Sequence, residues 1–276
     1  MRYTLKEQVM SFLKKTLASF GIGSARVDST LQQEFILPGE KVSILIEVYG
    51  GATAQDIDNI DLKIFCRYVE EVPIDNDKNS HNSHARRTRR APRNYVLARW
   101  QLPYAFTIEA GQHRTFDAQL DVPMNTPVTI GDTKVWLETG LDISTAKDPT
   151  DKDMLTVRPT PILDGIFSAL EEEGLRIRQV ECEATKGFAL PFVQEFEFVP
   201  TTGPFHGRWR ELEIVAYQHE AELELWFEID RQKKGVGGML SNLLGTGKLK
   251  RNLRIPQNTQ AEDAGKMVVD YLQTTS

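Results

Sequence analysis

Five arginines stand close together in the chain, and their chemistry is that of anion recognition. Arg86, Arg87, Arg89, Arg90 and Arg93 could hold an acidic protein, an anionic lipid surface or a nucleic-acid backbone. No aromatic residue is interleaved with them, which argues against base stacking and specific nucleic-acid binding. Residues 75–94 contain almost nothing that could enter a core, so we expect a loop joining two strands. A solvated insertion without a partner is the other interpretation.

The histidines do not form a convincing metal site. His81 and His84 have the spacing of half a zinc site, but zinc needs three or four convergent ligands. The remaining histidines are scattered: His113, His206 and His219. Asp148, Asp151 and Asp153 offer oxygen ligands, yet the glycine and the terminal glutamate of a calcium loop are missing. We therefore predict a solvated acidic turn and no bound metal.

Other catalytic or cofactor-binding motifs are also incomplete. The glycine-rich segment before Lys248 differs from a phosphate loop, because Asn242 occupies the leading glycine position and Leu249 lacks a hydroxyl. There is no Gly-x-Ser-x-Gly nucleophile elbow. Cys66 and Cys182 lie in strand-like runs and are interpreted as core residues. We predict that the chain binds no cofactor and is not an enzyme.

Size and composition describe a globular protein of two domains. The chain has 276 residues, 40% of them hydrophobic and 26% charged, with a net charge of −6. Its negative charge disfavours nonspecific binding of nucleic acid by the whole surface. No apolar run is long enough for a membrane span, and lysines interrupt the first 20 residues as they would not in a signal peptide. With only two cysteines, a reduced cytoplasmic protein is expected.

Period-two alternation dominates the chain and predicts half-buried strands. The clearest case is 41–49, where every second residue is apolar: Val42, Ile44, Ile46 and Val48. Residues 115–122 and 134–143 alternate in the same way on either side of Pro123 and Pro127. Many short alternating strands with few helices favour an all-β fold of sandwiches over a parallel α/β fold.

We expect two β-sandwich domains, at residues 1–146 and 147–276, separated near Asp148-Pro149. An amphipathic helix over 5–20 should precede the first sandwich and pack on it, or else lie on a membrane. In the second, Thr160, Pro161 and Gly174 predict a helix over about 160–174, and another helix should end the chain. Glutamates alternating with the apolar residues of 220–230 predict a wet face, with Trp226 exposed on it.

Several motifs together resemble a known family. LPGEKVSILIEVYGG, DVPMNTPVTIGDTKVWLETGLDI and FEIDRQKKGVGGML occur in this order, and the chain from about residue 10 to 255 is similar to the bacterial sporulation-control proteins with an arrestin-like fold. The resemblance implies two tandem arrestin-like β-sandwich domains, a cytoplasmic regulatory role and no catalytic residues.

Three functions remain open from the sequence. The first is a noncatalytic scaffold that binds unidentified proteins through sheet edges and loops. The second is an adaptor for anionic membrane surfaces that uses the arginines at 86–93 and the first helix. The third is a hydrolase built on a sandwich, which would need a convergent polar pocket. The oligomeric state is not indicated by any feature of the sequence.

Overall fold

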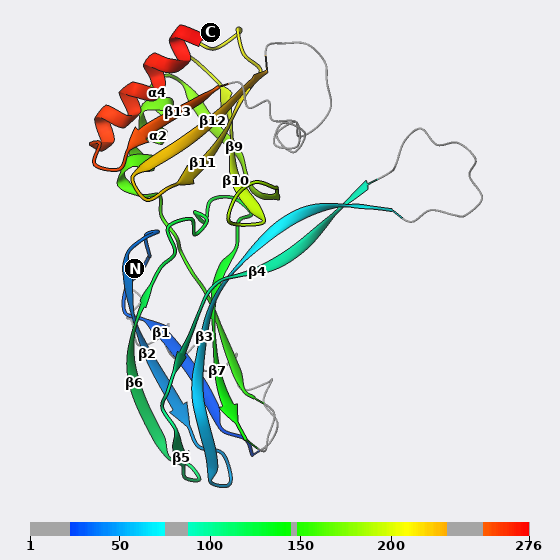
Figure 1. Cartoon of the computed structure of the whole chain (residues 1–276), viewed down its shortest axis with the longest axis vertical. Coiled ribbons are helices and arrows are strands. Elements are labelled where there is room, and N and C mark those ends of the chain that lie inside the picture. The colour runs from blue at the N-terminus through cyan, green and yellow to red at the C-terminus, as the bar shows by residue number, and fades with distance from the viewer. Residues whose placement is uncertain (1–22, 75–87, 145–147, 231–250, 276) are drawn as a thin grey trace, which may run out of the picture.

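The computed structural model describes residues 23–74, 88–144, 148–230 and 251–275. The helix expected over 5–20 and the glycine-bounded loop at 235–247 lie outside these residues. Strands make up most of the described chain, together with two helices (Figure 1). The expectation of an all-β protein with few helices is confirmed.

The first unit is a sandwich of two sheets. One sheet has the order β1-β2-β6 and consists of β1 (Arg26–Leu31), β2 (Lys41–Tyr49) and β6 (His113–Asp121). The facing sheet is built around β3 (Gln55–Pro73), which pairs with β4 (Thr88–Leu102), β5 (Phe106–Ile108) and β7 (Val135–Ile143). The short strand β8 (Thr150–Met154) extends it beyond β7.

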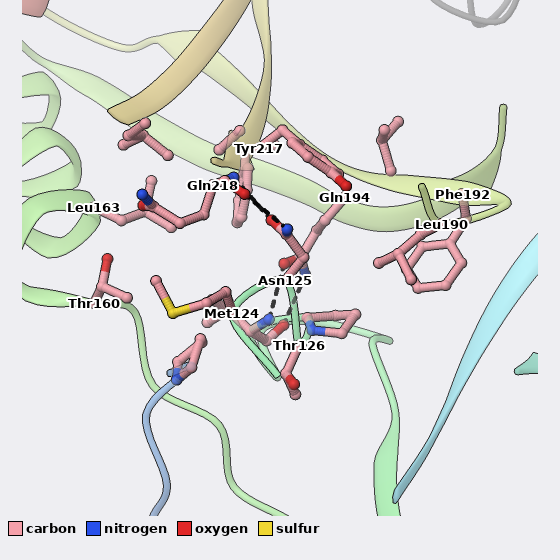
Figure 2. A pocket seen from close by; sticks show the side chains of 17 residues that line it. Met124, Asn125, Thr126, Thr160, Leu163, Leu190, Phe192, Gln194, Tyr217 and Gln218 are labelled. Carbon is pink, nitrogen blue, oxygen red and sulfur yellow. Dashed lines mark hydrogen bonds between the residues drawn. The ribbon is translucent and has the colours of Figure 1, made fainter. Parts of the chain in front are cut away.

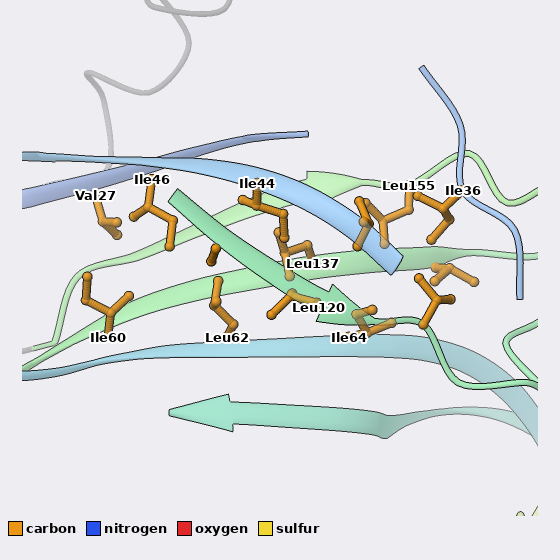
Figure 3. Close-up of a cluster of buried hydrophobic side chains, with 14 of the residues drawn as sticks. Val27, Ile36, Ile44, Ile46, Ile60, Leu62, Ile64, Leu120, Leu137 and Leu155 are labelled. Atoms are coloured by element: carbon orange, nitrogen blue, oxygen red, sulfur yellow. The ribbon is translucent and has the colours of Figure 1, made fainter. Parts of the chain in front are cut away.

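The core of this sandwich comes from the alternation that the sequence shows. Val42, Ile44, Ile46 and Val48 of β2 are all buried, as predicted. They meet the inward-facing residues of β3 and β7, such as Leu62 and Leu137, between the two sheets (Figure 3). Strand periodicity alone therefore decides which side chains form this core.

The second unit is one antiparallel sheet covered by two helices. Its strands are β9 (Leu175–Ala184), β10 (Phe192–Pro200), β11 (Glu211–Gln218), β12 (Glu222–Asp230) and β13 (Asn252–Pro256), paired in this order. The helices are α2 (Pro161–Glu172) and α4 (Ala261–Thr275), and their apolar residues join those of the sheet in one core. The layer opposite the sheet is thus helical, where a second sheet was expected.

The boundary between the units lies later than the predicted break after residue 146. Strand β8 pairs with β7, and Leu155 and Val157 belong to the core of the first sandwich. The second unit starts with α2, where Thr160 is the N-cap residue and Pro161 opens the helix, as predicted. Residues 147–153 were predicted to be a linker because they are polar. In the structure the aspartates of β8 point inward, which charged residues of a strand rarely do.

The helices α2 and α4 cross at two glycines. A Cβ atom added to Gly165 would clash with the backbone of Ala261, and one added to Gly265 would lie 2.7 Å from the Cβ of Ala169. Real Cβ atoms do not come so close to other heavy atoms, so side chains at these positions would push the helices apart. The glycines therefore set the distance between α2 and α4.

We expect Gly165→Ala to destabilise the protein by about 1–3 kcal/mol, because the added methyl group overpacks the helix crossing. In an exposed helix the same Gly→Ala change would stabilise the protein by about 1 kcal/mol. The sign of the change in unfolding free energy therefore distinguishes a close helix crossing from the effect of helix propensity. The exposed Ser168 of the same helix supplies the control, since Ser168→Ala should leave the protein as stable or slightly more stable. Chemical unfolding followed by circular dichroism measures both; a stabilised Gly165→Ala protein would contradict the close crossing.

Candidate functional site

The predicted arginine cluster is divided between two environments. Arg86 and Arg87 lie outside the described residues. Arg89, Arg90 and Arg93 belong to β4 and are in register with β3, so the prediction of a loop over 75–94 is wrong for its last seven residues. The backbone pairing with β3 overrides the low hydrophobicity of this segment, because ladder hydrogen bonds do not depend on side-chain type.

Two of these arginines are already engaged in ion pairs. Arg90 donates to Glu181 Oε2 at 2.5 Å and to Glu183 Oε1 at 3.0 Å, both on β9 of the second unit. The hydrogen bond to Glu181 raises the pKa of Arg90. Burial raises the pKa of Glu183, against the opposing effect of Arg90. Arg93 Nε donates to Glu70 Oε2 at 2.8 Å within the hairpin itself. The basic segment therefore binds acidic groups of its own chain.

The β3–β4 hairpin forms an arm that reaches the second unit (Figure 1). Near its middle Val69 pairs with Glu183 of β9 as a parallel neighbour, which makes the strands of both units one continuous sheet. The ring of Phe192 in β10 stacks on Tyr68 at 5.3 Å and meets Tyr95 edge-on at 5.9 Å. Apolar contact and ion pairs thus hold the arm against the second unit together.

The connection between β6 and β7 docks on the second unit through two side-chain amides (Figure 2). Gln194 accepts from Val128 N at 2.8 Å and donates to Val128 O at 2.7 Å. Asn125 accepts from Gln218 N at 2.8 Å and donates to Gln218 O at 3.0 Å. Each amide therefore pairs with a backbone as a neighbouring strand would, and it satisfies groups that have little access to water.

Residues 156–158, which lead from β8 to α2, are held by hydrogen bonds to Ile36 and to Thr129. Ile36 N donates to Thr156 O at 2.9 Å, and Arg158 N donates to Ile36 O at 3.0 Å. Thr129 N donates to Val157 O at 3.0 Å, and Val157 N donates to the Thr129 hydroxyl at 2.9 Å. Three stretches that are distant in sequence are thereby tied by backbone hydrogen bonds.

A cavity at this junction has a volume of about 50 Å³. Met124, Leu163, Leu190 and Tyr217 are among the side chains around it, and Gln194 reaches it from β10 (Figure 2). Sites that bind metabolites usually measure several hundred Å³. This cavity is large enough for water or one small apolar side chain.

The two cysteines are buried, and His113 and His219 each lie beside a glutamate. Cys66 and Cys182 are buried free thiols, as predicted, and burial raises the pKa of Cys66 to about 12. His113 Nε2 lies 3.1 Å from Glu47 Oε1, and His219 Nε2 lies 2.9 Å from Glu224 Oε2. Within the described ranges no group of histidine, cysteine, aspartate and glutamate side chains is arranged to hold a metal ion.

The predicted solvated turn at Asp148–Asp153 is wrong for two of its aspartates. Asp151 is buried and accepts from Ser29 N at 3.0 Å, and Asp153 accepts from the Ser29 hydroxyl at 2.8 Å. Burial, followed by the charge of Asp151, raises the pKa of Asp153 to about 7. Burial also raises the pKa of the neighbouring Asp28. β1 and β8 lie at the edges of different sheets and are not paired by backbone hydrogen bonds with each other. The carboxyl groups of Asp151 and Asp153 join them through Ser29.

The outer face of the second sheet is acidic, but it is less exposed than predicted. Burial, followed by the charge of Glu213, raises the pKa of Glu195 to about 8. Burial and the charge of Glu228 raise the pKa of Glu213 to about 7. Trp226 was expected to be exposed and is buried, because Phe188 from the β9–β10 turn packs edge-on against its ring at 5.1 Å.

Comparison with known proteins identifies the relatives of this chain. A model of the family described as SpoOM protein matches residues 13–233. The sporulation-control protein spo0M of Bacillus subtilis (strain 168) is 36% identical over 260 residues, which cover 94% of this chain and 95% of that protein. The chain belongs to the Spo0M family. The crystal structure of Spo0M from Bacillus subtilis matches with a TM-score of 0.77 at 31% identity, over 92% of this chain and all of the crystallised one.

Membership of the Spo0M family confirms the resemblance found in the sequence motifs and supports a regulatory role in sporulation. The family is described by this control function and not by a reaction. In the part of the chain that the structure covers, neither helix combines the length and apolar content needed to cross a bilayer.

The junction amides were missed in the sequence, although one signal for them existed. Gln194 shares the parity of Phe192, Phe196 and Phe198 along β10, so it is a polar residue in an apolar stripe. Such a residue must be hydrogen-bonded when buried. Its partner Val128 is 66 residues away in sequence, and no spacing rule could have identified it.

We expect Gln194→Ala to destabilise the protein by about 1–3 kcal/mol, because Val128 N loses its partner in a buried place while Val128 O keeps only the hydrogen bond from Ile130 N. Gln179→Ala, at an exposed glutamine on β9, is the matched control and should change stability by less than about 0.5 kcal/mol. Denaturant unfolding gives both values, and hydrogen exchange should show faster exchange of the Val128 amide only in Gln194→Ala. Equal stability of the two variants would contradict the role of Gln194.

We expect Glu195→Gln to make stability less dependent on pH. The folded pKa of Glu195, about 8, lies above its ordinary value of 4.5, so the stabilisation that protonation provides is complete below about pH 4.5 and lost as pH rises through 8. The variant should melt a few degrees above the parent protein at pH 9 and close to it at pH 5. Glu220→Gln, at an exposed position, should show no such trend in thermal melts across this range.

Proposed function

We propose that this protein is a noncatalytic regulatory scaffold that acts in the cytoplasm by binding other proteins. Its membership of the Spo0M family supports a place in the control of sporulation or a related developmental response. The buried thiols, whose pKa values are raised by burial, support binding over turnover. A sandwich hydrolase has no comparable support among the described residues.

The observation that carries the proposal is the free edge of β4. This strand has 15 residues and pairs with β3 alone among the described strands. Pro92 lies within it, and proline is tolerated in a strand where its missing N–H would face away from the ladder. An unpaired edge of this length presents N–H and C=O groups that an extended peptide can complete as a further strand.

The direction of these groups follows from the register. Arg67 N donates to Lys134 O on the β7 side, so the pair of Arg67 with Asn94 is not hydrogen-bonded across β3 and β4. Asn94 therefore directs its N–H and C=O to the free edge, and Pro92 directs its C=O there. A peptide bound there would lie beside the arm that joins the two units.

An adaptor for anionic membranes remains the second candidate, with Arg86, Arg87, Arg89, Arg90 and Arg93 as its contacts. Two observations weaken it, since Arg90 and Arg93 are paired with carboxylates of the chain itself. No ion pair forms at Arg89 within the described residues, so among the exposed cations of β4 it is one without a carboxylate partner there. The edge of β4 is therefore the better-supported binding element.

We expect Asn94→Pro to reduce recovery of bound protein by about tenfold, because it removes an edge donor that an added strand would use. Asn94→Ala keeps the N–H and serves as the matched control. Tagged full-length protein would be used to capture partners from native lysate at several growth stages, with quantification by mass spectrometry.

A saturable partner that is lost with Asn94→Pro and retained with Asn94→Ala supports the proposal. Circular dichroism of both variants shows whether β4 is intact. Absence of any saturable partner at all stages, or equal capture by both variants, would refute binding at this edge.

A further inference from the structure

Strand β8 shows an inverted pattern of polar and apolar residues. Its aspartates, Asp151 and Asp153, point into the edge of the sandwich, whereas Lys152 and Met154 point outward. Met154 is 58% exposed, more than any other large hydrophobic residue of the described chain. Hydrogen bonds from Ser29 account for the buried carboxylates, whereas exposing Met154 to water adds nothing to stability, so the outer face is a candidate for contact with a partner.

Met154 is the end of an apolar row that crosses four strands. The register places Met154 opposite Trp136, Trp136 opposite Phe65, and Phe65 opposite Val96. Residues directly opposite in antiparallel strands share a face, so all four lie on the outer side of the sheet. The rings of Phe65 and Trp136 stack at 5.3 Å, and Val96 at the far end is 40% exposed.

Cations border this apolar row on both sides. On one side the register places Lys152, Glu138, Lys63 and Arg99 in the neighbouring row, and Lys152 Nζ lies 4.1 Å from the centre of the Trp136 ring. On the other side Arg67 and Lys134 are joined by a backbone hydrogen bond of 3.0 Å. Two carboxylates lie among these five cations: Glu138 stands between Lys63 and Lys152, and Asp61 forms ion pairs with Arg99 at 2.7 Å and with Lys63 at 4.0 Å. The face is basic although the chain carries a net charge of −6.

The dimensions of the row suit one helix. Four strands have three spacings of about 4.8 Å, so the row is about 14 Å long and matches about 10 helical residues. The cationic rows lie about 7 Å to each side, which is where the flanks of a helix about 10 Å wide would rest. Apolar residues at i, i+3, i+4 and i+7 would contact the row, and acidic residues on the flanks would meet the cations.

We propose that the outer face formed by β8, β7, β3 and β4 binds an acidic amphipathic helix of a partner protein. This inference rests on the proposed function as a protein-binding scaffold and names a second surface and the chemistry of its partner. Apolar burial on the row supplies affinity, and the surrounding cations supply orientation and selection for acidic flanks.

Other occupants fit the charge of this face less well. Residues 1–22 of the chain contain four cations, Arg2, Lys6, Lys14 and Lys15, and one carboxylate, so like charges oppose their docking. The same repulsion opposes face-to-face pairing with a second copy. An anionic lipid surface shares the charge complementarity but not the shape, because a flat bilayer does not match a row about 14 Å long whose exposed apolar residues are Met154 and Val96 at its two ends.

The test uses the full chain labelled with ¹³C at its methionine methyl groups. The probe is a synthetic acidic helix of about 14 residues, with leucines at i, i+3, i+4 and i+7 and glutamates on the flanks. We expect the Met154 methyl signal, assigned with Met154→Leu, to shift in a saturable way. A peptide with lysine in place of each glutamate should bind at least about tenfold more weakly.

Charge variants locate the contact. The double variant Lys63→Glu and Lys152→Glu should weaken binding of the acidic helix by about tenfold or more, whereas Lys266→Glu on α4, an equally drastic change at an exposed lysine, should not.

The proposal is overturned if the acidic helix causes no saturable shift of Met154, or if the acidic and the basic peptide bind equally. It is also overturned if Met154 responds instead to vesicles of phosphatidylcholine and phosphatidylserine, since the face would then serve a membrane. A partner from lysate could require the edge of β4 and still bind the double charge variant. That result would support the proposed scaffold function and show that this partner does not bind the outer face.

Discussion

The arrangement of this protein depends on pairing the backbone of residues 123–130 where it meets the second unit. Val128 is buried there, and its N–H and C=O have no neighbouring strand. Gln194 takes the place of that strand, and Asn125 does the same in reverse for the backbone of Gln218. Leaving these buried backbone groups without hydrogen bonds would cost more free energy than the conformational entropy lost by ordering the two amide side chains. The hydrogen bonds therefore favour one orientation of the two units.

The arm and the outer faces follow from this docking. With the units fixed, β3 is long enough to leave the first sandwich and run beside β9, where Arg90 finds Glu181 and Glu183. Cations accumulate on the outer face of the first unit, and carboxylates accumulate on that of the second. The chain thus has two outer faces of opposite charge joined by one continuous sheet, an arrangement that would suit the proposed scaffold if it selects partners electrostatically.

Alternation in the sequence predicted the first sandwich well, because an inward or outward position is a local property of a strand. The helix at α2 was predicted from Thr160 and Pro161 for the same reason. The predictions for 88–94 and for Asp151 and Asp153 were wrong. In each case a polar segment was assumed to seek water, while its true partners, β3 and Ser29, lie elsewhere in the chain.

Residue type and the spacing of a few positions were enough to predict the strands, the faces of the first core, the buried cysteines and the family. Other features emerge only in the folded chain: helices cover the second sheet, Gln194 meets Val128, Arg90 is paired, and four apolar residues align from Met154 to Val96. Each of these depends on contacts between residues far apart in sequence, and strand register across a sheet is fixed by the assembled hydrogen-bond ladder rather than by any local pattern.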